Sequence, residues 1–186
     1  MSRHMNRRAL LGGGAGVLAL AGCGNGVGAG GAALIDARVQ ATQSFLQQNY
    51  ASARDLQARA VGQLVMPLIT EAGFFAGGAY GRGALVVNGV TVDYYSATQA
   101  SFGLQIGAQQ YAHVLYFMTE EALQEFRTSP GWEAGADVEY ALNDRGANAG
   151  ATSTTLLTPV IGIVFGQQGL LAGASIEGTK YTRIIP

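Results

Sequence analysis

Short apolar segments separated by glycine-containing turns recur along most of this sequence, and they constrain its fold more than any other feature. The clearest case is Asn88-Gly89, which stands between the strand-like segments Ala84–Val87 and Val90–Tyr95. Because both central residues of a two-residue hairpin turn need a positive φ, this pattern predicts a β-hairpin. Similar segments predict further strands at Phe102–Ile106, Tyr111–Met118, Ala136–Leu142, Val160–Phe165, Leu170–Ile176 and Thr179–Ile184. Strands at this spacing predict an antiparallel sheet that curls into a barrel or a sandwich.

Two parts of the sequence follow the helical period instead. Residues 33 to about 63 contain no proline and predict N-terminal helices with a break near residues 49–52. The predicted buried stripe of the first helix consists of Leu34, Ala41, Phe45 and Leu46. Thr119 and the two glutamates after it predict a helix start, because a hydroxyl can cap exposed N–H groups and carboxylates suit the positive end of the helix dipole. The predicted fold class is α+β, with N-terminal helices and one helix inserted around residues 119–128.

The amino-terminal segment has the layout of an export signal. Arg7 and Arg8 supply positive charge, and Ala9–Ala21 has no charged side chain and is shorter than the roughly 20 residues of a spanning helix. Small residues then lead into Cys23, the only cysteine. This arrangement resembles the lipobox of bacterial lipoproteins, in which the cysteine is acylated and the preceding peptide is removed. The resemblance implies a signal peptide at residues 1–22 and a lipid anchor on Cys23.

The segment around the anchor also bears on localisation. Gly24 follows the cysteine in place of aspartate, which by resemblance to enterobacterial sorting favours the outer membrane, facing the periplasm. The paired arginines loosely resemble a twin-arginine signal, so general secretion and twin-arginine export both remain open, and Met5 is an alternative start. Residues 23–32 are expected to form a glycine-rich tether, and residues 33–186 a single domain.

Charge and cysteine content exclude several classes of protein. Three arginines leave with residues 1–22, and the remaining chain carries eight basic and twelve acidic residues, a net charge of −4. A mildly acidic domain is a poor nucleic-acid binder and is not drawn to anionic lipid as a whole, so any headgroup attraction must come from a local basic patch. With one cysteine, no disulfide within the chain can form.

A glycine-rich segment in the middle of the chain has two interpretations. Leu64–Met66 is a short apolar run that Pro67 is expected to end, and Gly77–Gly83 follows it. The glycines suggest a phosphate loop, but the Lys-Ser/Thr ending and the following helix of a P-loop are missing. We interpret Gly77–Gly83 as strand and turn with close packing, in which Arg82 can still meet a lipid phosphate.

The residue types needed for catalysis are sparse. His113 is the only histidine after Cys23, and a strand histidine satisfied by a neighbour explains it better than a catalytic base. The usual zinc ligand sets and the Gly-x-Ser-x-Gly elbow are missing from the sequence. Trp132 is expected to fill the core near a helix end, and Glu120 and Glu121 to match the helix dipole. We therefore expect no enzyme and no cofactor.

Ordered sequence matches carry a family resemblance. The matching segments are Ala72–Phe74, Gly77–Gly83, Tyr95-Ser96, Phe102–Gln109, Phe117–Thr119, Phe126, Gly131–Asp137, Phe165–Leu170 and Glu177–Lys180. Together they resemble the SYLF domain, also called Ysc84-like, over roughly Leu64–Pro186. The resemblance implies binding to lipids, including phosphoinositides in eukaryotic members, and to actin in some fungal ones. Those phosphoinositide binders also use a basic amphipathic helix, whereas here Arg38, Arg54 and Arg59 are spread among acidic residues.

The leading functional hypothesis is a lipid-anchored, non-catalytic protein whose domain binds membrane phospholipid, through phosphoinositide-like or other anionic headgroups. The arginines considered for headgroup contact are Arg54, Arg59, Arg82 and Arg183. Lys180 and Arg183 would point to opposite faces of a strand, so they would not form one patch. Actin is not an expected partner of an envelope protein, and the oligomeric state is left open. The alternatives are a structural or partner-docking envelope lipoprotein whose only lipid contact is its anchor, and a hydrolase.

Overall fold

The computed structural model describes residues 31–74, 76–102, 107–135, 138–140, 158–166, 169–170 and 176–186. Cys23, the signal segment, most of the tether, and parts of the strands predicted at residues 102–106, 136–142 and 170–176 lie outside these residues. The helices are α1 (Gly31–Asn49), α2 (Ala51–Arg59) and α3 (Glu120–Thr128). The long strands are β1 (Gly62–Phe74), β2 (Ala76–Val87), β3 (Val90–Phe102) and β4 (Gly107–Phe117). The shorter strands are β5 (Trp132–Glu133), β6 (Val138–Tyr140), β7 (Val160–Gly166), β8 (Gly169–Leu170) and β9 (Lys180–Ile184).

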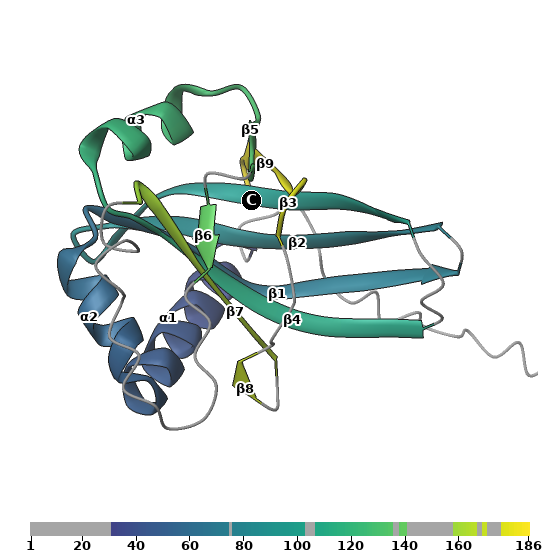
Figure 1. The fold of residues 1–186 in the computed structure, drawn as a ribbon, viewed down its shortest axis with the longest axis horizontal. Helices are drawn as coiled ribbons and strands as arrows, with labels where there is room; N and C mark the ends of the chain where they lie inside the picture. Colours follow the sequence, from purple (N-terminus) through teal and green to yellow (C-terminus); the bar gives the residue numbers. More distant parts are fainter. Residues whose placement is uncertain are drawn as a thin grey trace, which may run out of the picture.

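The strands form one curled sheet in the order β5-β9-β3-β2-β1-β4-β7-β6, with β8 paired to β7 (Figure 1). Every pair is antiparallel except β6 with β7. Strands β9 and β4 are four strand spacings apart, about 19 Å along a flat sheet. Even so, the Tyr181 hydroxyl lies 2.7 Å from His113 Nε2. The sheet must therefore curl toward the face that carries these two side chains, and the predicted α+β fold with a curled antiparallel sheet is confirmed as a half-barrel.

Alternate residues of the strands build two cores. Leu64, Met66 and Leu115 face the concave side, with α3, and Val65 and Val114 face the convex side, with α1 and α2. Figure 1 shows α3 on one side of the sheet and α1 and α2 on the other. The central strands are thus buried on both faces, which explains why their sequences are almost wholly apolar there. The same four long strands extend beyond all three helices (Figure 1).

Two local predictions are confirmed. Asn88 and Gly89 have φ values of 51° and 78°, and Val87 pairs with Val90, so the predicted hairpin is present with both turn residues left-handed. Thr119 caps α3, because its hydroxyl accepts the N–H of Ala122 at 3.2 Å. The segment Gly77–Gly83 lies within β2 as a strand. At Gly83 a Cβ atom would lie 2.0 Å from the Val65 carbonyl oxygen, so the predicted close packing is confirmed.

Pro67 does not end its strand, contrary to the prediction. Strand β1 continues through it with a bulge, since Met66 pairs with His113 and Ile69 with Tyr111, which leaves Pro67 and Leu68 facing the single residue between. A bulge residue makes no ladder hydrogen bond, so a proline without an N–H is tolerated there. The bulge also bends β1 at this point on the convex face.

The predicted buried stripe of the first helix is mostly wrong. The buried side chains of α1 are Ile35, Val39 and Leu46, whereas Leu34 is 41% and Phe45 is 39% exposed. The two stripes are one residue apart, which rotates the buried face by about 100°. Asp36 helps to choose between them, because its carboxylate accepts hydrogen bonds from Thr91 and Tyr94 of β3 at 3.0 and 2.9 Å.

Candidate functional site

An apolar pocket opens on the convex face, where the β1 bulge lies beside the last turns of α1. Its volume is about 280 Å³. The lining residues are Phe45, Pro67, Leu68, Gln110, Tyr111, Ala112, Phe165 and Gly166. None of these side chains carries a charge at neutral pH, and Gln110 alone contributes an amide, so the pocket suits a hydrocarbon group better than an ion.

The pocket follows from the irregularity of β1. Pro67 and Leu68 together face Ala112 of β4, so the strand bends away from the regular ladder at this point. Ala112 pairs on its other side with Phe165 of β7. Its methyl group leaves space that a larger side chain would fill, and the Phe45 ring stacks on Phe165 with 5.8 Å between centroids and 20° between planes. One helix and three strands thus supply the pocket walls.

Tyr111 is the only ionisable residue of the lining. Burial raises the pKa of its phenol to about 12, with a smaller contribution from the negative charge of Glu71. Its hydroxyl lies 3.5 Å from the Gln99 side-chain oxygen. The phenol therefore stays neutral at physiological pH, and its side chain packs in the concave core.

An exposed apolar stripe on α1 leads to the pocket. Leu34, Ala41 and Phe45 are exposed, as is Arg38 between them, and the four fall within about 60° of one another around the helix. Asp36, the only acidic residue of α1, faces the sheet through its two hydrogen bonds. The residues predicted to be a buried stripe are therefore an outward surface, and Phe45 belongs both to this stripe and to the pocket wall.

The structure does not gather the four predicted arginines in one place. Arg54 and Arg59 are exposed on α2, and Arg54 donates to the Gln47 carbonyl at 2.7 Å. Arg82 lies in a cross-strand row with Ser96 and Thr182 on the convex face, whereas the row of Arg183 includes the buried Tyr95 of the concave core. Three of the arginines thus belong to the side of α1 and α2, and Arg183 belongs to the opposite face.

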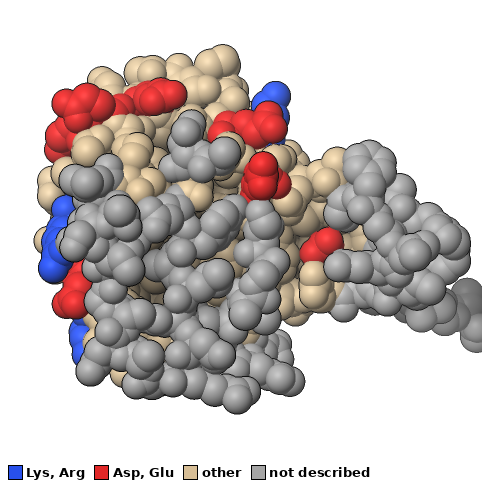
Figure 2. Space-filling view, viewed as in Figure 1, with Lys and Arg blue, Asp and Glu red and all other residues tan. Residues whose placement is uncertain are grey.

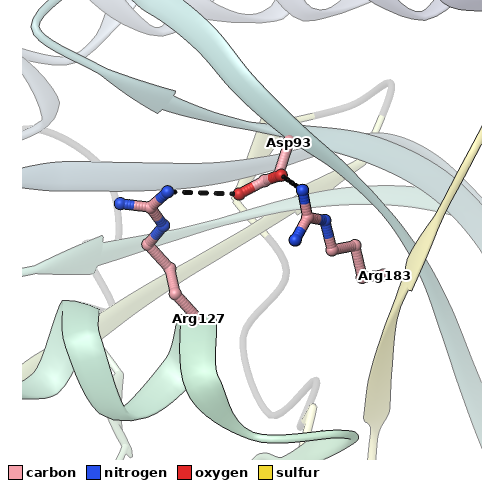
Figure 3. A network of polar contacts seen from close by, with 3 residues as sticks. All are labelled: Asp93, Arg127 and Arg183. Atoms are coloured by element: carbon pink, nitrogen blue, oxygen red, sulfur yellow. Dashed lines mark ion pairs between the residues drawn. The ribbon is translucent and has the colours of Figure 1, made fainter.

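Arg183 takes part in an ion-pair cluster at the concave face. The carboxylate of Asp93 on β3 lies 2.5 Å from an Arg183 nitrogen on β9 and 3.6 Å from an Arg127 nitrogen on α3 (Figure 3). The Asp93 side chain is only 5% exposed, so its charge needs both partners, while the guanidinium groups reach toward solvent. The cluster joins α3 to the two strands and was not predicted, because the three residues are distant in sequence.

His113 is buried and has a hydrogen-bonding neighbour, as expected for a histidine in an apolar strand. It is 1% exposed, and burial lowers the pKa of its imidazole to about 3. Nε2 is bonded to the Tyr181 hydroxyl, and Nδ1 has no hydrogen-bond partner among the described residues. Trp132 is partly buried and packs against this core, with ring centroids 5.5 Å from Phe126 and 5.9 Å from Tyr181, so its predicted place in the core is confirmed only in part.

The surface charge of α3 is mainly acidic, whereas that of α2 is mixed. Figure 2 shows acidic side chains over α3, where Glu120, Glu121 and Glu125 are exposed, and both basic and acidic side chains at the edge of the molecule where α2 lies. Within the described part of the chain, no group of three acidic, histidine or cysteine side chains is placed to hold a metal ion. None of the described helices is long and apolar enough to cross a membrane.

Comparison with known families gives one match. The Ysc84 family model, described as Las17-binding protein actin regulator, matches residues 98–183. This range runs from within β3 to within β9 and contains the pocket residues of β4 and β7, but it includes no part of α1, α2, β1 or β2. No curated protein matches the sequence. The match confirms the resemblance predicted from the ordered segments, over the part of the chain that it covers.

Proposed function

Because residues 98–183 carry the SYLF (Ysc84-like) domain, a family associated with lipid binding, we propose that this protein binds phospholipid without catalysing a reaction. In this proposal, an acylated Cys23 anchors the protein to the outer membrane of a bacterial envelope, facing the periplasm. The domain then contacts the bilayer itself. The family description names Las17 and actin, but the export signal points to a compartment where neither is expected.

The exposed apolar stripe of α1 is the observation that carries the proposal. Leu34, Ala41 and Phe45 present hydrocarbon to the outside, with Arg38 as the only charged residue among them. A helix with this surface can lie in the interface of a bilayer, with its apolar groups below the headgroups and its arginine at their level. Helix α1 begins eight residues after Cys23, so it is the described element nearest to the anchor in sequence.

The basic residues on the same side supply the headgroup contacts in this proposal. Arg38, Arg54 and Arg59 lie on α1 and α2, and Arg82 belongs to the convex face that these helices cover. The exposed guanidinium groups of Arg38, Arg54 and Arg59 can donate to phosphate oxygens, and the attraction falls as salt screens it. The net charge of −4 on the mature chain is then compatible with anionic lipid, because the exposed glutamates of α3 lie on the other face and the arginines outnumber the exposed Asp55 on α1 and α2.

Vesicle co-sedimentation of residues 24–186 tests the proposal. All described helices and strands lie in this range, and the acylated cysteine is missing, so any binding comes from the domain. We expect binding to vesicles of phosphatidylglycerol and phosphatidylethanolamine that weakens as salt rises. Leu34→Ser and Phe45→Ser should each weaken it about tenfold, since each removes one large apolar contact.

Val90→Ser is the matched control, because Val90 is 63% exposed at the start of β3, next to the hairpin turn, and lies outside the stripe. It should bind vesicles as the unchanged domain does. If the unchanged domain ignores every vesicle, the proposal fails, and a partner-docking lipoprotein whose only lipid contact is its anchor takes its place. Equal losses in all three variants would also count against the stripe as the contact surface.

A further inference from the structure

We propose that the convex pocket beside Phe45 holds the end of one acyl chain of a membrane phospholipid. This inference rests on the proposed function and names the site at which a lipid molecule is recognised. It differs from surface association, because a pocket takes up a single chain and saturates, whereas an interfacial helix only partitions into the bilayer.

The chemistry of the lining selects a hydrocarbon chain. The walls are the side chains of Phe45, Pro67, Leu68 and Phe165, with the methyl group of Ala112 at one side. A phosphate or an ion would lose its hydration here without meeting a counter-charge, whereas methylene groups would leave water for contact with apolar side chains. Burial keeps Tyr111 neutral, so no charge develops at physiological pH.

The size of the pocket limits the occupant to part of a lipid. Its volume of about 280 Å³ lies just below the range of roughly 300–1,000 Å³ that holds whole drug-sized ligands. A two-chain phospholipid does not fit, but the terminal part of one straight chain does. The headgroup and the second chain would then remain outside, at the membrane.

Phe45 connects the pocket to the bilayer. Its ring is 39% exposed, stacks on Phe165, and meets Tyr50 edge-on with 6.0 Å between centroids. Because it ends the apolar stripe that we propose lies against the membrane, a chain could pass from the bilayer into the pocket along apolar surface. A polar row borders the opposite side, where the Gln110 amide donates to Thr70 at 3.4 Å and Tyr80 and Thr98 continue across the sheet. The pocket thus has one apolar approach and one polar border.

Titration of residues 24–186 with cis-parinaric acid, a fluorescent 18-carbon fatty acid, tests the site. We expect saturable binding of one probe molecule per protein molecule. Ala112→Leu should fill the pocket and weaken binding at least about tenfold, because the added carbons occupy the space that the chain would take. Ala100→Leu is the matched control, since Ala100 is exposed on β3 and is not part of the pocket lining, and it should leave binding unchanged.

A second variant keeps the test decisive if Ala112→Leu does not fold, which Trp132 fluorescence in urea would reveal. Phe45→Ser removes one wall at a half-exposed site and should weaken probe binding about fivefold or more. Non-saturable binding, or unchanged affinity in the folded pocket variant, would overturn the inference. Vesicle binding that survives either result would leave the proposed function standing and remove only the pocket.

Competition experiments distinguish a phospholipid from a free fatty acid as the source of the acyl chain. Lysophosphatidylcholine, a phospholipid with a single chain, should displace the probe when used below its micelle concentration. Displacement by oleate alone would overturn the phospholipid assignment and point to free fatty acid instead. Displacement by both supports a phospholipid chain, because the site then accepts the chain with its headgroup attached.

Discussion

The two faces of the curled sheet use alternate residues of the same strands, yet they are closed in different ways. The concave face is sealed by aromatic contacts, in which the Phe126 ring lies 4.7 Å from Tyr95 and 4.9 Å from Phe117, and by the ion pairs of Asp93. The convex face is covered by α1, which is fixed to β3 by the hydrogen bonds of Asp36 and leaves an open pocket beside Phe45. Both faces thus bury a core, but the convex face also keeps an open pocket.

The two faces also differ in which side chains they bury. The free energy gained from burial scales with the apolar area removed from water, and the fully buried aromatic residues lie mostly on the concave side. Side chains on the convex side, such as Phe45, can then be selected for contact with a ligand. Matched substitutions on the two faces should therefore have unequal effects on stability.

Phe126→Ala should have the largest effect on stability. Phe126 is 0% exposed and contacts four other aromatic rings, so its removal should lower the free energy of unfolding by about 3–5 kcal/mol. Phe45→Ala, at a ring that is 39% exposed, should cost only about 1 kcal/mol. Urea unfolding followed by the fluorescence of Trp132 measures both, and equal losses would show that the two faces contribute alike.

Acid should destabilise the concave core through His113. Its pKa is lowered from 6.5 to about 3 in the folded protein, so below pH 6.5 the unfolded chain gains a proton that the folded protein does not bind. The contribution of the neutral imidazole to stability is complete above pH 6.5 and is lost as the pH falls toward 3. At pH 5 the loss should be about 2 kcal/mol.

His113→Gln isolates this effect from the titration of the carboxylates. The variant should be less stable than the unchanged protein at pH 7.5, because the bond to Tyr181 changes, but its stability should fall less between pH 7.5 and pH 5. Urea midpoints at the two pH values measure the difference. Parallel pH dependence in the two proteins would show that His113 is not the acid-sensitive group.

Asp93→Asn should weaken the closure of the concave face more moderately. The substitution keeps the shape but removes the charge that Arg127 and Arg183 share, and these side chains are 42% and 69% exposed, so water can solvate them. We expect a loss of about 1–2 kcal/mol in the free energy of unfolding. Glu125→Gln removes an exposed carboxylate from α3, the helix of Arg127. It should change the free energy of unfolding by less than about 0.5 kcal/mol. A similar loss in both variants would mean that the cluster contributes no more than an ordinary surface charge.

Local features of the fold were predictable because their signals lie within a few residues. The hairpin at Asn88-Gly89 follows from the need for positive φ, and the start of α3 follows from the cap at Thr119. The role of His113 was also predictable, since a lone histidine in an apolar strand is usually buried. In each case the residue and its immediate neighbours contain the physical cause.

Features set by tertiary contact were not predictable in the same way. The two possible stripes of α1 have similar apolar content, and the choice between them depends on Asp36 meeting Thr91 and Tyr94, which lie 55 and 58 residues away. The Asp93 cluster likewise joins distant residues. One local feature of the sequence indicated the pocket. A proline inside a strand, such as Pro67, is typical of a bulge, but it was interpreted as the end of the strand.

Asp36→Ala tests the attachment of α1 on the convex face and should have a smaller effect on stability than Phe126→Ala or Asp93→Asn. It removes the acceptor for the hydroxyls of Thr91 and Tyr94, which should cost about 1 kcal/mol in the free energy of unfolding. The pKa of Tyr94, which is raised by burial and by its bond to Asp36, should move back toward 10 in the variant. Tyrosine titration followed by absorbance would detect this shift.

Amide hydrogen exchange then shows whether the two faces are energetically separate. In Asp36→Ala we expect faster exchange along α1 and unchanged exchange in β4, because α1 can loosen while the concave contacts hold the sheet. Asp93→Asn is the matched comparison, and it should accelerate exchange in α3 and leave α1 unchanged. If either variant accelerates exchange equally on both faces, the sheet and its helices open as one unit. The convex face could then not release a lipid chain without disturbing the concave core, and binding at the pocket should stabilise the whole domain rather than α1 alone.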